Sequence, residues 1–96
     1  MTDTGTTEPV NYIDEIVARL DEKIPGNDVA LLRLYALLAL TQGVNTTLEN
    51  VHDAWGAWRT ATNPGHKSLV PFDQLTPEVQ EYDRKYMDAI HEVSAR

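Results

Sequence analysis

The sequence predicts an all-α fold, a compact four-helix domain with a long ordered apolar loop between the third and fourth helices. Apolar residues recur at helical spacing in four segments, residues suited to helix capping stand where those segments begin, and no segment shows the alternation of a strand. At 96 residues, 42% of them hydrophobic and 24% charged, the chain is long enough for one such domain and too short for two.

The first helix is expected to begin directly after Asn11, whose side chain can accept a hydrogen bond from an amide of the first turn. Its apolar residues fall on one face, and Pro25 and Gly26 end it. We interpret the polar residues 1–10 as a flexible tail that precedes a single helical domain over 11–96.

The second helix is expected to open at Asn27 or Asp28 and to run to about Gln42. Gly43 follows it and can adopt the left-handed conformation that closes a helix. The segment is apolar nearly all round, which is typical of a central helix covered by its neighbours. Together the first two helices, over residues 11–47, would support the remaining part, over 48–94.

The third helix is expected to begin at Thr46, with Glu49 three residues later completing a capping box. Asn63, Pro64 and Gly65 end it.

The segment that follows, up to Leu75, is too apolar for a solvated loop, so we expect Leu69, Val70 and Phe72 to be buried against Trp55 of the third helix. Thr76 then caps the last helix, with Pro77 at its first position.

Composition and charge argue against several classes of protein. The net charge is −7, and the chain shows no basic stripe, so we expect no binding to nucleic acid. No apolar run reaches the roughly 20 residues of a membrane span, and the N-terminus has no secretory signal, so we expect no membrane partner and a cytoplasmic location. With no cysteine, thiolate metal sites and thiol nucleophiles are excluded.

Catalytic and metal sites find little support in the spacing of reactive residues. His52, His66 and His91 lack the spacing of a helical metal site such as H-E-x-x-H. Ser68 stands outside a G-x-S-x-G elbow. We expect Asp83 to be half-buried and to pair with a basic residue or accept amide hydrogen bonds from the loop. The prediction is therefore a non-enzymatic protein without cofactor or metal.

A ligand site is nevertheless indicated by a local group of cationic and aromatic residues. Trp58 and Arg59 near the end of the third helix, with His66 and Lys67 in the loop, could hold a small anionic or planar ligand. The alternative is that Arg59 and Lys67 only pair with nearby carboxylates such as those of Asp53 or Asp73.

The region from residue 51 to 90 resembles the ryanodine-receptor repeat domain. The resemblance depends on an H-x-x-W pair, an H-x-x-L-V-P-F segment followed by a leucine, and a closing acidic D-R segment: His52, Trp55, His66 to Asp73, Leu75 and Glu81 to Arg84. Lys67 stands where the family usually has a proline, and the insertion that the receptor repeats carry before the second histidine is absent.

The resemblance implies a helical binding module, not an enzyme, of the kind that serves as a clamp-like repeat in the receptors. For prokaryotic and viral versions, nucleotide-derived ligands have been suggested. It also implies a structural core for the motif: His52, Trp55, Leu69, Val70, Pro71, Phe72, Leu75 and Asp83.

Two functions therefore remain open. One is a module for a small nucleotide-derived or anionic ligand. Its pocket would be made by the third helix, the 66–75 loop and the start of the last helix, beside Trp58, Arg59 and His66. The other is a protein-protein interaction or homo-oligomerisation module, using a flat apolar patch around Leu32, Tyr35 and Leu38. Either would suit a bacterial or bacteriophage accessory protein.

Overall fold

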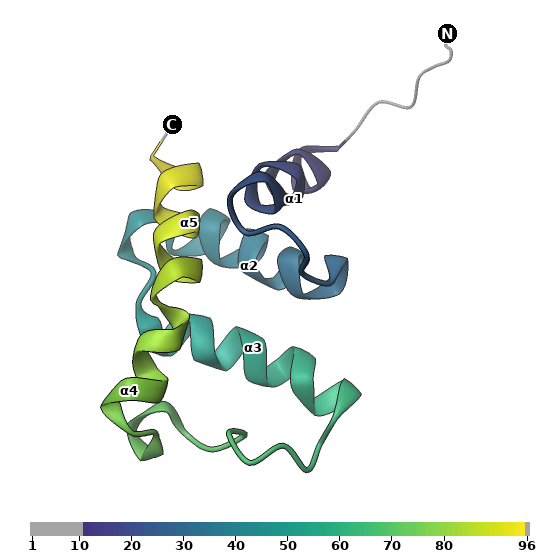
Figure 1. The fold of residues 1–96 in the computed structure, drawn as a ribbon. Coiled ribbons are helices and arrows are strands. Elements are labelled where there is room, and N and C mark those ends of the chain that lie inside the picture. Colours follow the sequence, from purple (N-terminus) through teal and green to yellow (C-terminus); the bar gives the residue numbers. More distant parts are fainter. Residues whose placement is uncertain (1–10, 96) are drawn as a thin grey trace, which may run out of the picture.

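A computed structural model describes residues 11–95, and within that range it contains helices and no strand (Figure 1). The all-α prediction is confirmed. In chain order the elements are α1 (Tyr12–Lys23), α2 (Val29–Thr41), the 3₁₀ turn η1 (Gly43–Asn45), α3 (Leu48–Thr62), the 3₁₀ turn η2 (Phe72–Gln74), α4 (Pro77–Gln80), the 3₁₀ turn η3 (Glu81–Asp83) and α5 (Arg84–Ser94). The tail predicted for 1–10 lies outside the described residues.

The first two helices begin and end where local sequence signals place them. The Asn11 side chain accepts a hydrogen bond from the amide of Asp14 at 2.8 Å, and that of Asp28 accepts from the amide of Ala30 at 2.7 Å. Gly43, with φ 58°, takes the left-handed conformation just after α2. These predicted boundaries are confirmed.

The predicted cap of α3 is wrong by one residue. Thr47, not Thr46, is the N-cap, and its side chain and that of Asn50 exchange hydrogen bonds with each other's backbone amides at 3.0 and 2.9 Å. Thr46 is buried, its hydroxyl donates to the carbonyl of Gly43 at 2.8 Å, and its own carbonyl accepts from His91 Nε2 at 2.7 Å. Thr46 therefore joins η1 to α5 instead of starting α3.

Replacing Thr47 by alanine should lower the free energy of unfolding by about 1 kcal/mol, the usual contribution of a hydroxyl cap. The cause is the loss of the acceptor for the Asn50 amide at the start of α3. Urea denaturation of Thr47→Ala beside Thr41→Ala, which removes an exposed hydroxyl at the end of α2, would measure the difference. Equal midpoints for the two variants would show that the capping box contributes nothing.

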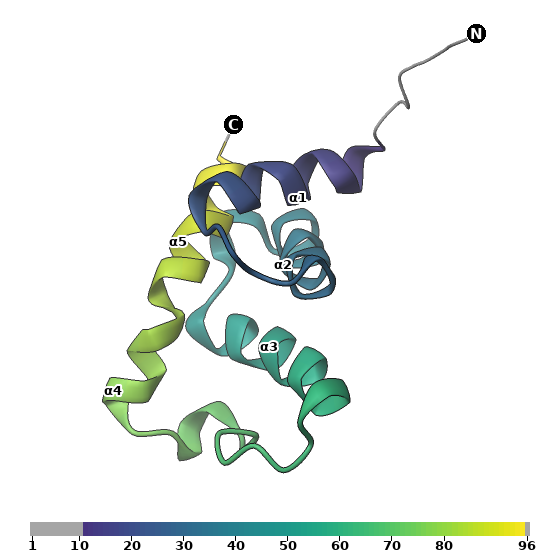
Figure 2. The same cartoon turned by 45° about the vertical axis from the view of Figure 1, so that its right-hand side comes forward.

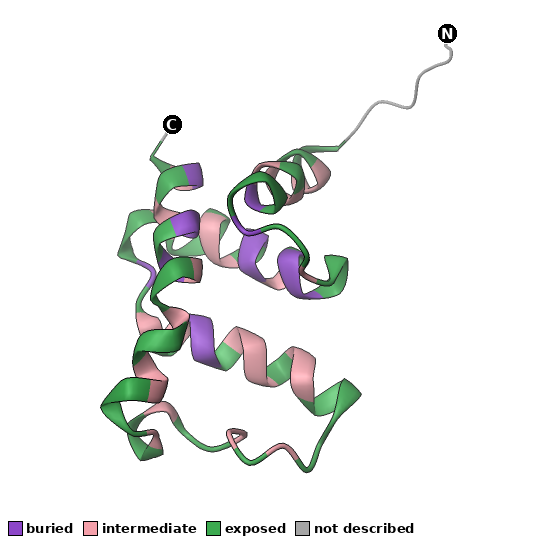
Figure 3. Ribbon diagram, in the orientation of Figure 1, coloured by how far each residue is buried: buried purple, intermediate pink, exposed green. Residues whose placement is uncertain are grey.

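The core lies where α2 meets α1, α3 and α5, so α2 is the central helix, as predicted (Figures 1 and 2). Buried positions are concentrated on α2 and α5, whereas the loop between α3 and α4 is exposed or half-buried (Figure 3). The largest fully buried side chains are those of Tyr35, Leu20, Leu32, Ile90 and Val51.

The apolar patch predicted on α2 is wrong in position. Leu32 and Tyr35 are each only 1% exposed, because they face the neighbouring helices. The exposed apolar side chains of this helix lie on its other side, where Leu37 is 54% and Leu40 is 47% exposed. Val44 of η1 is also exposed.

The last predicted helix is divided in two by η3. Thr76 caps α4 by accepting from the Val79 amide at 3.3 Å, as predicted. The Gln80 side chain at the end of α4 donates to the carbonyls of Phe72 at 3.0 Å and Leu75 at 3.3 Å. These bonds tie α4 to the loop, while Ile90 and Val93 of α5 are buried in the core. The 3₁₀ turn η3 therefore joins α4, which is bonded to the loop, to α5, which packs in the core.

Candidate functional site

His52 fastens the loop between α3 and α4 to the helices. Its side chain is buried, and its Nε2 donates a hydrogen bond of 2.7 Å to the carbonyl oxygen of Val70. Its ring stacks with Trp55 at a centroid distance of 5.6 Å and contacts Phe72 at 6.1 Å. One histidine of α3 thus holds both the backbone and an aromatic side chain of the loop.

The loop is anchored differently from the prediction. Val70 is 38% exposed and Pro71 is exposed, so neither side chain belongs to a buried cluster. Four other members of the predicted group are only half-buried: Trp55, Leu69, Phe72 and Leu75. Asp83 is half-buried, as predicted. The loop lies on one side of α3, and no other described helix covers its outer face (Figure 2). Its side chains are exposed or half-buried.

Backbone and side-chain hydrogen bonds also order the part of the loop that follows α3. The amide of Ser68 donates to His66 Nδ1 at 3.0 Å, and the amide of Leu69 donates to the carbonyl of His66 at 3.1 Å. Since Nδ1 of His66 is an acceptor, the proton of its neutral ring is on Nε2. The His66 ring meets the Trp55 ring edge-on at 5.1 Å, which fixes its position beside α3.

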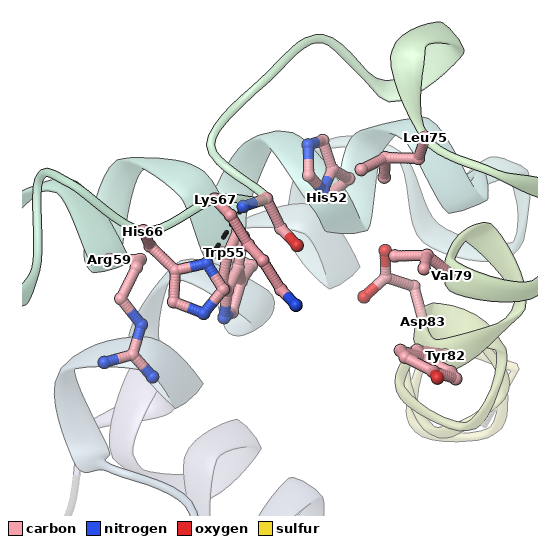
Figure 4. A pocket seen from close by; sticks show the side chains of 10 residues that line it. His52, Trp55, Arg59, His66, Lys67, Leu75, Val79, Tyr82 and Asp83 are labelled. Atoms are coloured by element: carbon pink, nitrogen blue, oxygen red, sulfur yellow. Dashed lines mark hydrogen bonds between the residues drawn. The ribbon is translucent and has the colours of Figure 1, made fainter.

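A pocket of about 440 Å³ opens between α3, this loop and the segment from α4 to η3 (Figure 4). Its lining combines aromatic, aliphatic and charged side chains: His52, Trp55, Arg59, His66, Lys67, Ser68, Leu75, Val79, Tyr82 and Asp83. Most of the lining residues carry polar or charged groups, which can fix the orientation of a small polar ligand.

Three of the four predicted ligand residues meet in this pocket, and Trp58 does not. Arg59, His66 and Lys67 line it, whereas Trp58 lines a second pocket of about 420 Å³ on the side of α3 that faces α2. Trp58 lies about 60° from Trp55 around the helix axis, so Trp55 reaches both pockets, whereas Trp58 lines only the second. Trp55 supplies the aromatic wall that was predicted for Trp58.

The cationic groups of the pocket are not neutralised by neighbouring carboxylates. Within residues 11–95 the ion pairs are Lys23 with Glu92 at 2.7 Å and Arg84 with Glu81 at 3.0 Å. Neither Arg59 nor Lys67 takes part in one. The alternative in which Asp53 or Asp73 pairs with them is therefore not what the structure shows.

Arg59 is held in place by aromatic rings. Its guanidinium carbon lies 4.3 Å from the centroid of the Trp58 ring and 5.9 Å from that of Trp55, within the range of cation-π attraction. One terminal nitrogen donates to the Thr62 hydroxyl at 3.3 Å. Its Nε is buried and has no hydrogen-bond partner in the described structure. The charge is positioned, but its hydrogen-bonding capacity is not fully used.

Asp83 brings a carboxylate to the opposite wall. It is half-buried, and no hydrogen bond or ion pair to its side chain occurs within residues 11–95. The prediction that it pairs with a basic residue or with loop amides is wrong. Figure 4 shows it pointing into the pocket, with the Lys67 ammonium group across the open space.

Burial raises the pKa of the Asp83 carboxyl above its ordinary value, and the nearby His52 partly offsets this. Burial also raises the pKa of the Tyr35 hydroxyl, with the charge of Asp83 adding to the effect. The folded protein thus binds the proton of Asp83 more tightly than the unfolded chain does. Its ionisation lowers the free energy of unfolding as the pH rises from the ordinary carboxyl pKa through the raised one.

Sequence reasoning placed the 66–75 loop and the start of the last helix at this site, but it did not single out Val79, Tyr82 or Ser68. Val79, Tyr82 and Asp83 stand at i, i+3 and i+4, so helical spacing does place them on one face. The spacing alone does not show whether this face lines a pocket or packs in the core.

The described residues contain no helix with the length and apolar character needed to cross a membrane. Over the same range there is no group of three or more His, Asp or Glu residues that could hold a metal ion.

Comparison with known proteins gives a family and no activity. Neither the curated proteins nor the solved structures contain a match to this chain. One family model matches residues 11–95, which span every helix from α1 to α5 and both parts of the predicted domain. The chain therefore belongs to the family described as domain of unknown function DUF7701.

Proposed function

We propose that this protein is a non-enzymatic binding module that takes a small anionic ligand, of the size and kind of a mononucleotide, in the pocket between α3 and the loop. The observation that carries the proposal is the convergence of Arg59, His66 and Lys67 on one pocket, with no carboxylate paired to either Arg59 or Lys67 in the described structure. In a chain of net charge −7, such a local cationic site attracts anions.

The shape and chemistry of the pocket favour a small molecule over a macromolecule. Its volume of about 440 Å³ lies in the range of small-molecule sites, roughly 300–1,000 Å³. Arg59 and Lys67 offer charged donors, and His66 offers Nε2–H from the tautomer that the Ser68 amide selects. Trp55 supplies an aromatic surface beside them.

The resemblance of residues 51–90 to the ryanodine-receptor repeat supports the same proposal independently. It implies a binding module, and the residues that carry it, among them His52, Trp55 and His66, line the pocket. The family match carries no description of a ligand, so the resemblance remains a prediction.

Adenosine 5′-monophosphate should bind the wild-type chain, and the double variant Arg59→Gln/Lys67→Gln should bind it at least about tenfold more weakly. Each lost hydrogen bond to a charged group is worth about 1.5–3 kcal/mol, and tenfold corresponds to about 1.4 kcal/mol. Isothermal titration calorimetry at low salt is the measurement. The control Arg33→Gln/Lys85→Gln removes the same charge from exposed positions outside the pocket and should change the affinity far less.

An equal loss of affinity in both double variants would mean that only overall charge matters, and the proposed site would be wrong. Thermal unfolding of each variant would establish that the fold is retained.

The second candidate function is self-association. Leu37 and Leu40 of α2 and Val44 of η1 are exposed apolar side chains close together in sequence on a helix and the turn after it. A second copy of the chain could cover them. A dimer mass by light scattering, combined with no binding of adenosine 5′-monophosphate to the wild type, would favour this function.

A further inference from the structure

The pocket has opposite charges on its two sides. The positive charges of Arg59 and Lys67, with the N–H donor of His66, lie on the side of α3 and the loop, and Asp83 of η3 lies on the other (Figure 4). Asp83 is the one acidic residue in its lining as described. No ion pair joins Lys67 to Asp83, so a ligand can enter the space between them.

A carboxylate in this position restricts which anions fit. An ionised Asp83 only accepts hydrogen bonds and repels negative charge. A ligand that fills the pocket displaces water from this half-buried group, and an unpaired carboxylate would then carry a large desolvation cost. A ligand that places an N–H or O–H donor there removes that cost and gains a charge-assisted hydrogen bond.

We propose that Asp83 is the specificity-determining residue of the pocket, selecting anionic ligands that carry an N–H or O–H donor at the end opposite the anionic group. This inference rests on the proposed function, because it requires that the cationic side holds an anion. It adds that anions without such a donor, though equally charged, are disfavoured.

The other side chains of the lining are consistent with this division of the pocket. Tyr82 and Val79 flank Asp83, whereas His66 and Trp55 flank the cationic side. A ligand with an anionic end, a planar apolar middle and a donor end would therefore match the pocket: the anionic end would meet the cationic side, the middle the aromatic rings, and the donor end Asp83.

A matched pair of probes tests the inference: 4-aminophenyl phosphate and 4-methylphenyl phosphate have the same charge and nearly the same shape, and differ in one amino or methyl group. The wild-type chain should bind the amino compound about tenfold more tightly, the discrimination expected from one hydrogen bond to a carboxylate. Asp83→Asn should reduce the preference to about threefold or less, partly because the methyl compound binds more tightly once the negative charge is gone.

Asp88→Asn is the matched control, because Asp88 is an exposed carboxylate of α5 outside this pocket, and it should leave the preference unchanged. Affinities would come from amide chemical shifts in NMR titrations, which also report whether each variant is folded.

The outcomes separate the two proposals. Equal affinity of the wild type for both probes, or an undiminished preference in Asp83→Asn, overturns the role of Asp83 while leaving the anion site standing. Absence of shifts for both probes at millimolar concentration overturns the proposed anion site and this inference with it.

Discussion

Leu32→Ala should lower the free energy of unfolding by about 2–5 kcal/mol, the usual range for truncating a buried leucine. Leu32 is 1% exposed in the middle of α2, so the substitution leaves a cavity among the helices that pack on α2. A domain of this kind has a total stability of about 5–15 kcal/mol. The variant should therefore lose a large part of it, and urea denaturation followed by circular dichroism would measure the loss.

The same helix provides the control. Leu37→Ala makes the same chemical change five residues later, but Leu37 is 54% exposed. It should change the stability by no more than about 0.5 kcal/mol, as is usual for surface substitutions. Similar losses in both variants would show that the two faces of α2 are equally covered in solution, as they would be in an oligomer.

His52→Ala should destabilise the protein by about 2–3 kcal/mol and should loosen the loop before the helices unfold. The variant loses the hydrogen bond to the Val70 carbonyl together with the contacts to Trp55 and Phe72. A hydrogen bond contributes about 0.5–1.5 kcal/mol, and an aromatic contact adds about 0.5–1.5 kcal/mol. Relative to the wild type, the substitution should accelerate hydrogen exchange at the loop amides of Gln74 and Leu75 more than at the amides of α2.

Asp53→Ala, at the next position of α3 and exposed, should leave the exchange of these amides unchanged. Unaltered loop exchange in His52→Ala would mean that the Gln80 bonds to the loop carbonyls are sufficient to hold it, and that His52 has no anchoring role.

Much of the fold follows from signals within a few residues. Asn11, Asp28 and Thr76 cap the helices that they were predicted to cap, and Gly43 takes the left-handed conformation after α2. These features depend on one side chain and the backbone beside it, so the sequence is enough to locate them. The cluster of Arg59, His66 and Lys67 was likewise found from the sequence, because its members lie within a few residues of one another along the chain.

The start of α3 shows where local signals become ambiguous. Thr46 with Glu49 matches the usual capping box, whereas the box in the structure is formed by Thr47 with Asn50, where Asn replaces the usual Glu or Gln. The structure uses Thr47, while the carbonyl of Thr46 accepts a hydrogen bond from His91, 45 residues away. A contact over that separation leaves no trace in the spacing of neighbouring residues.

The sequence by itself determined the helical class, most helix ends and the cationic group beside the loop, because each depends on side-chain type and short-range spacing. Tertiary structure decided three other things: which face of α2 is buried, that His52 holds the loop through the Val70 carbonyl, and that Asp83 points into the pocket without an ion pair to any described residue. A helix that is apolar all round carries no periodicity to orient it. A backbone carbonyl is the same at every residue, so the sequence cannot show which one a histidine will find.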